Sequence, residues 1–149
     1  MASTPLPLPQ RSQAFLRDFS LEFEDERLIV LALQAAGAQD RDGNKKLALI
    51  GDSILRLIIH LEGFNRGMSR GMIDDMVKRL ACNAHLAECG FTAGLDAYIW
   101  NNPSQGNKIS DNLMATTVEA ILGAVFLDND QDLAAVQTVM AMFGLTWPE

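Results

Sequence analysis

Two acidic residues, Asp52 and Glu119, occupy positions where an isolated acid is unexpected. Asp52 lies within NKKLALIGDSILRLIIHLEGF (residues 44–64), where aliphatic residues recur at helical spacing. Glu119 is the only charged residue between Asp111 and Asp128, in a segment that is apolar nearly all round. Burying an acid costs roughly several kcal/mol unless it is paired or bound to a metal ion. We therefore expect both acids to be buried and to meet across two packed helices, where they share a cation or a proton. The alternative is that each acid merely pairs with a lysine, an arginine or a backbone N–H.

The elements that must position these acids are helices. Alanine, leucine, isoleucine and methionine recur at helical spacing, and no segment alternates as a half-buried strand would. Glycines separate the periodic segments. The pattern predicts an all-α fold with helices at about residues 25–36, 45–62, 71–80, 83–88, 111–127 and 132–143.

The length of 149 residues predicts one folded domain, and no apolar run reaches 18 residues, so no membrane contact is expected. A net charge of −7 speaks against nucleic acid as a partner. The charge is uneven, however, because residues 41–79 hold eight basic and five acidic residues. This stretch is either a solvated helix face or a surface that contacts phosphates, with Lys45, Lys46, Lys78 and Arg79 as the candidate contacts.

The N-terminal segment and the cysteines bear on location. Residues 1–20 begin MASTPLPLP, and we expect them to form a flexible, proline-rich tail. Residues 1–17 contain two arginines and no acid, as organelle transit peptides do, although the prolines argue against the helix that such a peptide needs. The two cysteines do not make a disulfide framework, which predicts an intracellular, reducing compartment. Cytoplasm, nucleus and mitochondrion all stay open.

The two acid-bearing segments resemble the signature motifs of the ribonuclease III domain. The first motif is matched by NKKLALIGDSIL (residues 44–55) and the second by MATTVEAILGAVFLD (residues 114–128). MVKRLACNAHLAECGFTAGLDAYI (residues 76–99) is similar to the middle helices of the family, and FEDERLIVLAL (residues 23–33) to its first helix. The resemblance implies a ribonuclease III domain over residues 21–145. Because the given sequence ends at Glu149, we expect no double-stranded-RNA-binding domain after it.

The resemblance implies an all-helical, symmetric homodimer that hydrolyses phosphodiester bonds of double-stranded RNA in RNA processing. In the family, Mg²⁺ is held by acids on two facing helices, which makes Asp52 and Glu119 the implied catalytic and metal-binding residues. RNA would be bound by the lysines and arginine named above. Leu49 stands where the family often has an aromatic residue at its dimer contact, and a ribosomal or other protein partner is a further possibility.

Two of the four principal family acids are missing. Ala48 and Thr116 stand in their places, and Lys45 replaces a further glutamate that is often seen after the asparagine. Two carboxylates and water can hold one Mg²⁺ or Mn²⁺ rather than two. The resemblance thus implies an endoribonuclease III-type hydrolase with weak or altered activity. The alternative is a catalytically inactive module that binds RNA or protein, for example in a ribosomal particle, and uses no metal.

Overall fold

The computed structural model describes residues 6–106 and 108–149, and this part of the chain is all-helical. Its α-helices are α1 (Leu8–Asp18), α2 (Glu26–Ala32), α3 (Lys45–Asn65), α4 (Arg70–Leu80), α5 (Asn83–Thr92), α6 (Asp111–Asp128) and α7 (Leu133–Met142). Two short 3-10 helices, η1 (Leu95–Tyr98) and η2 (Pro103–Gln105), lie between α5 and α6. The predicted all-α fold is confirmed, and none of the described helices is long and apolar enough to cross a membrane.

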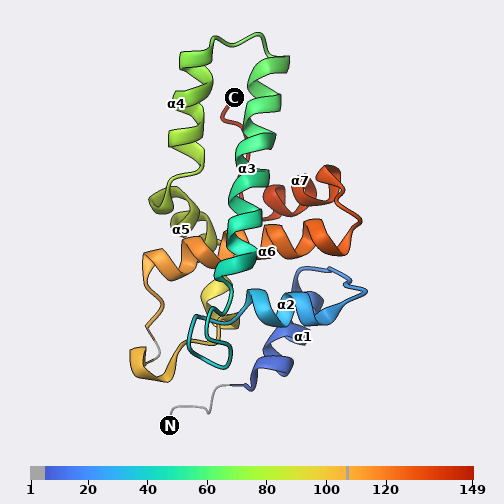
Figure 1. Cartoon of the computed structure of the whole chain (residues 1–149), viewed down its shortest axis with the longest axis vertical. Coiled ribbons are helices and arrows are strands. Elements are labelled where there is room, and N and C mark those ends of the chain that lie inside the picture. Colours follow the sequence, from blue (N-terminus) through green and yellow to red (C-terminus); the bar gives the residue numbers. More distant parts are fainter. Residues whose placement is uncertain (1–5, 107) are drawn as a thin grey trace.

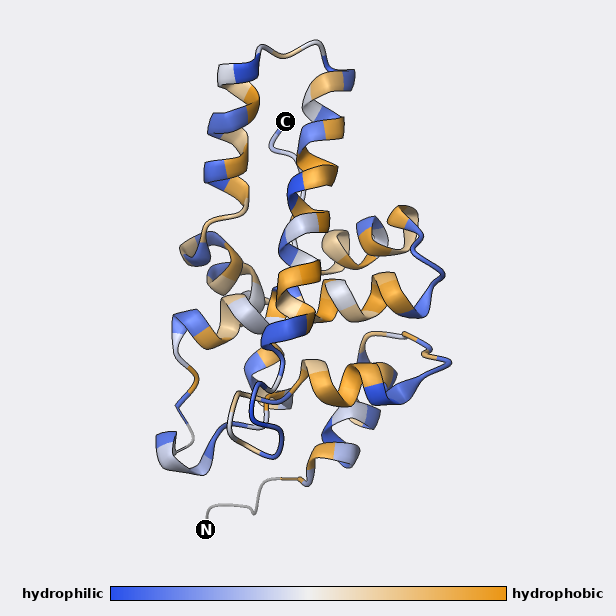
Figure 2. Cartoon of the chain, in the orientation of Figure 1, coloured by the Kyte–Doolittle hydropathy of each residue, from blue (hydrophilic) through white to orange (hydrophobic). Residues whose placement is uncertain are grey.

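Helix α6 is the centre of the molecule. It crosses the long helix α3, while α5 and α7 also pack against it (Figure 1). Its residues are hydrophobic on most sides (Figure 2), and ten of its 18 residues are buried. A helix that is apolar all round is stable only when neighbours cover every side. The nearly uncharged sequence of α6 therefore explains why this helix lies in the core, covered by its neighbours.

The six predicted helices are all present, and α2 differs most from its prediction because it ends at Ala32 rather than at residue 36. After α2 the chain pairs with a distant segment: the N–H of Ala35 donates to the carbonyl of Trp100 (2.9 Å), and the N–H of Trp100 donates to the carbonyl of Leu33 (2.8 Å). These long-range hydrogen bonds replace the last helical turn. The ends of α4, α6 and α7 agree with the prediction to within one residue.

The expectation that residues 1–20 form a flexible tail is wrong for residues 8–18, which form α1. Pro7 precedes this helix and Pro9 lies in its first turn, where a missing N–H leaves no helical hydrogen bond unmade. Leu8 and Phe15 are both fully buried in the core. The prolines are compatible with the first turn of this helix, and burial of its apolar face stabilises the rest. Residues 1–5 of the expected tail lie outside the described residues.

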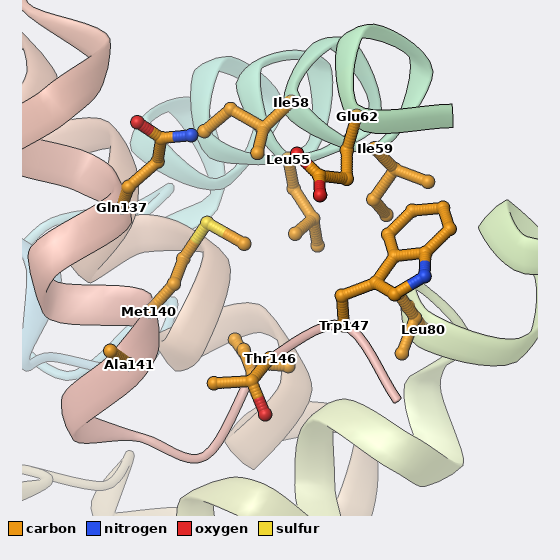
Figure 3. Close-up of a pocket in the computed structure, with 11 residues that line it drawn as sticks. Leu55, Ile58, Ile59, Glu62, Leu80, Gln137, Met140, Ala141, Thr146 and Trp147 are labelled. Atoms are coloured by element: carbon orange, nitrogen blue, oxygen red, sulfur yellow. The ribbon is translucent and has the colours of Figure 1, made fainter. Parts of the chain in front are cut away.

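The C-terminal segment crosses an apolar cavity of about 210 Å³ between α3 and α7 (Figure 3). Arg66, directly after α3, holds this segment in place. Its guanidinium lies 4.8 Å from the ring centre of Trp147 and binds the carboxylates of Glu149 (2.5 Å) and Glu62 (2.7 Å). The hydrogen bond with Arg66 lowers the pKa of Glu149, while Glu149 and Glu62 together raise the pKa of Arg66.

Candidate functional site

Two glycines let the backbones of α3 and α6 touch where the helices cross. A Cβ atom added to Gly51 would lie 1.7 Å from the carbonyl oxygen of Glu119, and one added to Gly123 would lie 2.3 Å from that of Leu47. No larger residue fits at either position without moving a helix. The glycine before Asp52 is therefore the reason that Asp52 and Glu119 lie next to each other.

The two carboxyl groups interact, as predicted from the sequence. The pKa of Glu119 is raised to about 8, first by burial, then by a hydrogen bond with Asp52 and by repulsion from its charge. The positive charge of Arg56 opposes this shift. An acid with a pKa near neutral, beside a second acid, is a recurrent feature of functional sites. Burial and the neighbouring carboxylate thus favour the protonated form of Glu119.

Asp52 also forms an ion pair with Arg56, which agrees with the alternative that an acid here pairs with an arginine. The Nε of Arg56 lies 3.1 Å from both carboxylate oxygens of Asp52, one helical turn earlier on α3. The expectation that both acids are buried is wrong, because both are only partly buried and the side chain of Asp52 is 36% exposed. The reason is that α6 covers only one side of α3 at the crossing and leaves the side with Arg56 in water. The spacing of four residues was the signal in the sequence for this pair.

The positions of the missing acids lie one turn before each retained acid. Ala48 is buried, and the hydroxyl of Thr116 donates to the carbonyl of Asn112 (2.8 Å) within its own helix. In the part of the chain that the structure describes, no three aspartate, glutamate, histidine or cysteine side chains are grouped to hold a metal ion. Two carboxylates leave most of the coordination shell of a hard cation to water. Binding that ion requires loss of the Glu119 proton and release of Asp52 by Arg56.

Asn44 is a site-building residue that the sequence analysis did not single out. It is fully buried directly before α3, and its Nδ2 donates to the carbonyl of Ala32 and to the hydroxyl of Thr117 on α6, both at 3.0 Å. Its N–H also donates to the carbonyl of Gln34 (3.0 Å). Asn44 thus connects α2, α3 and α6 and fixes where α3 begins. The signal available in the sequence was an asparagine directly before an apolar helical segment.

The four candidate RNA-binding residues are all exposed, but they lie on two helices. Lys45 and Lys46 form the first turn of α3, where Lys46 lies 3.7 Å from Asp42. Lys78 and Arg79 form the last turn of α4. No ion pair of Lys45, Lys78 or Arg79 is found within the described residues. These three charges are available to a phosphate.

The fold and the site together define an all-helical domain with an acid pair at the crossing of its two central helices. In sequence, the model of the ribonuclease III domain matches residues 45–130. The chain belongs to the ribonuclease III family.

Relatives in sequence and structure agree with this assignment. The chain is 34% identical over 122 residues to ribonuclease 3 of Vibrio vulnificus (strain YJ016), covering 78% of this chain and 54% of the relative. It is 32% identical over 137 residues to ribonuclease 3 of Oleidesulfovibrio alaskensis, covering 85% of this chain and 59% of that relative. The chain thus spans little more than half the length of these relatives. A nuclease-domain structure of ribonuclease III from Campylobacter jejuni has the same fold, with a TM-score of 0.77, 20% identity and coverage of 90% of this chain and 96% of that one.

Proposed function

We propose that this protein acts on double-stranded or structured RNA in RNA processing, as a symmetric homodimer, and that its site supports slow hydrolysis with one Mg²⁺ or Mn²⁺ ion. The ribonuclease III domain comprises residues 21–145, with α1 packed onto it. The observation that carries this proposal is the contact between Asp52 and Glu119 at the glycine-lined crossing of α3 and α6. A family-type acid pair is in place, although the set around it is reduced.

Each retained residue has a role in this proposal. Asp52 and Glu119 are the catalytic residues, because their oxygens would hold the ion. A bound ion would supply a hydroxide nucleophile and stabilise charge on the leaving oxygen. Lys45, Lys46, Lys78 and Arg79 would bind backbone phosphates, and the net charge of −7 makes RNA binding weak and easily reversed by salt.

The proposed dimer contact is the apolar side of α3 that this chain leaves uncovered. Leu49, Leu57 and Phe64 are 72%, 45% and 78% exposed, and their spacing of eight and seven residues places them on one side of the helix. Exposed apolar residues grouped on one side of a helix form the kind of surface that a protein partner covers. A second copy of the chain would cover them, with Leu49 at the contact where the family often has an aromatic residue. Analytical ultracentrifugation of wild type and a Leu49→Asp, Phe64→Asp variant tests this dimer.

A catalytically inactive family member that binds RNA or protein is the second candidate function. Two observations favour it: Arg56 holds the carboxylate of Asp52, and Glu119 keeps its proton at pH 7 because its pKa is about 8. In this function the acid pair has a structural role at the helix crossing. No metal is then needed.

Incubation of the purified protein with structured RNA and Mg²⁺ or Mn²⁺ separates the two candidates. Slow cleavage that disappears in an Asp52→Asn, Glu119→Gln variant supports the enzyme, and wild type that binds RNA without cutting it supports the inactive module. Cleavage that persists in this variant comes from a contaminant and argues against hydrolysis by this chain.

Restoring the missing acids tests how much of the machinery survives. An Ala48→Glu, Thr116→Asp variant should bind a second ion and cleave faster than wild type, if only the acids were lost. Metal binding by this variant without cleavage would show that the RNA-binding surface has changed as well. Circular dichroism checks that the variant folds, since Ala48 is buried.

A further inference from the structure

The apolar cavity between α3 and α7 has the size and the lining of a site for a small hydrophobic molecule. Its walls are aliphatic side chains such as Leu55 of α3, Leu80 of α4 and Met140 of α7, and the indole of Trp147 lies across it (Figure 3). Packed protein interiors leave few voids larger than a water molecule. An apolar cavity of about 150 Å³ is large enough to bind benzene. The volume of about 210 Å³ therefore accepts an aromatic ring with a short side chain.

The C-terminal segment, residues 145–149, is the wall of this cavity that can open. It is not helical, and only Leu145 is well buried, while Trp147 is partly buried and Thr146 and Glu149 are exposed. Arg66 holds this segment through its ion pair with Glu149 and its contact with the ring of Trp147. An exposed ion pair costs little to break. A ligand can therefore enter the cavity while the helices around it stay packed.

The charges beside the cavity select the head group of the ligand. Glu62 lines the cavity, and Arg66 binds both Glu62 and Glu149. This cluster has two carboxylates and one guanidinium, so its net charge is −1. A net charge of one at about 6 Å in water changes an affinity by about threefold. The cluster should thus attract an ammonium group and repel a carboxylate, which disfavours fatty acids as ligands.

We propose that this cavity is a binding site for a small hydrophobic amine, with the apolar body against Leu55, Met140 and Trp147 and the ammonium group beside Glu62 and Glu149. Neither Asp52 nor Glu119 lines the cavity. The site is therefore separate from the acid pair, and the proposal does not depend on the function proposed above.

Three probes with the same aromatic body and different head groups test the proposal: phenethylamine, 2-phenylethanol and phenylacetate. Binding is followed at low salt by NMR of the isoleucine δ1 methyl groups of the whole chain. Ile58 and Ile59 line the cavity and should shift, whereas Ile29 and Ile121, which are buried elsewhere, should not. For phenethylamine we expect a Kd of about 1 mM, which is realistic for a molecule of this size. Phenylacetate should bind about tenfold more weakly, and 2-phenylethanol should lie between them.

Two variants separate the cavity from its charge. Ala141→Phe places a ring at the cavity wall and should abolish binding of all three probes, while Ala134→Phe, at an exposed position of the same helix outside the cavity, should leave binding unchanged. Glu149→Gln makes the charged cluster neutral and should bring the affinities for amine and carboxylate to within about twofold. Trp147→Ala, which removes one wall, should weaken binding of every probe and serves as the second cavity variant if circular dichroism shows that Ala141→Phe is unfolded.

The proposal is overturned if no probe shifts Ile58 and Ile59, or if all four isoleucines shift alike. It is also overturned if binding is the same in wild type and in the folded cavity variant, because the probes then bind elsewhere. Phenylacetate that binds as tightly as phenethylamine would refute an amine as the ligand. A head-group preference that persists in Glu149→Gln would refute the charged cluster as its cause.

Discussion

Replacing Arg56 by glutamine should make the acid pair a better metal site. The Nε of Arg56 lies 3.1 Å from both oxygens of Asp52. A cation must therefore displace the guanidinium, and it is then repelled by the positive charge that stays nearby. Glutamine keeps the helix propensity and much of the length of the side chain but removes the charge. We therefore expect Arg56→Gln to bind Mg²⁺ or Mn²⁺ more tightly than wild type.

Two contributions set the size of this effect. An exposed ion pair four residues apart on a helix contributes about 0.3–0.5 kcal/mol, and the variant no longer has to break it. A divalent ion about 6 Å from a single positive charge is repelled by about 1.4 kcal/mol in water, and by about half of this at moderate salt. Together they give about 1–2 kcal/mol, which is about a 5- to 30-fold lower Kd.

Isothermal titration calorimetry measures this Kd for wild type and variant. The measurement belongs at pH 8.5, where Glu119, with its pKa of about 8, is mostly ionised. The matched control is Arg27→Gln, which removes an arginine paired with Asp25 on α2 and should leave the metal affinity unchanged. An unchanged Kd in Arg56→Gln, or binding that survives Asp52→Asn in the same background, would refute the reasoning.

The remaining predictions concern the stability of the fold around the site. Because the folded chain keeps the Glu119 proton that the unfolded chain releases, the free energy of unfolding should fall as the pH rises from about 4.5 to about 8, and Glu119→Gln should remove this part of the dependence in urea denaturation at several pH values. A contribution from Glu119 that grows with pH would contradict its raised pKa. Gly51→Ala should destabilise the protein by about 3 kcal/mol, since its Cβ would meet backbone at 1.7 Å, whereas Gly71→Ala, which points into open space, should be neutral or stabilising by up to about 1 kcal/mol. Equal effects of the two substitutions in urea denaturation would argue against a tight helix crossing. Arg66→Ala should release Trp147 and move its fluorescence emission to longer wavelength, and an unchanged spectrum would show that the C-terminal segment stays in place by packing alone.

Much of the fold could be predicted because its signals are local. The nearly uncharged segment around Glu119 predicted a buried central helix, and the structure makes α6 that helix. Phe15 shows where such reasoning fails. Its segment looks like a proline-rich tail, and only its burial in the core stabilises the helix it belongs to. Tertiary contacts of this kind override local propensity.

The sequence by itself determined the acids, the helices that carry them and the family to which the chain is similar. Helical spacing and two ordered motifs are properties of neighbouring residues, and they can be read without coordinates. Only the tertiary structure decided the electrostatic state of the site. The glycines at the crossing bring Glu119 against Asp52, while the exposed side of α3 lets Arg56 bind the same carboxylate. Solvent exposure, pKa and the meeting of residues far apart in the chain depend on how helices pack, and the spacing within one helix does not contain that information.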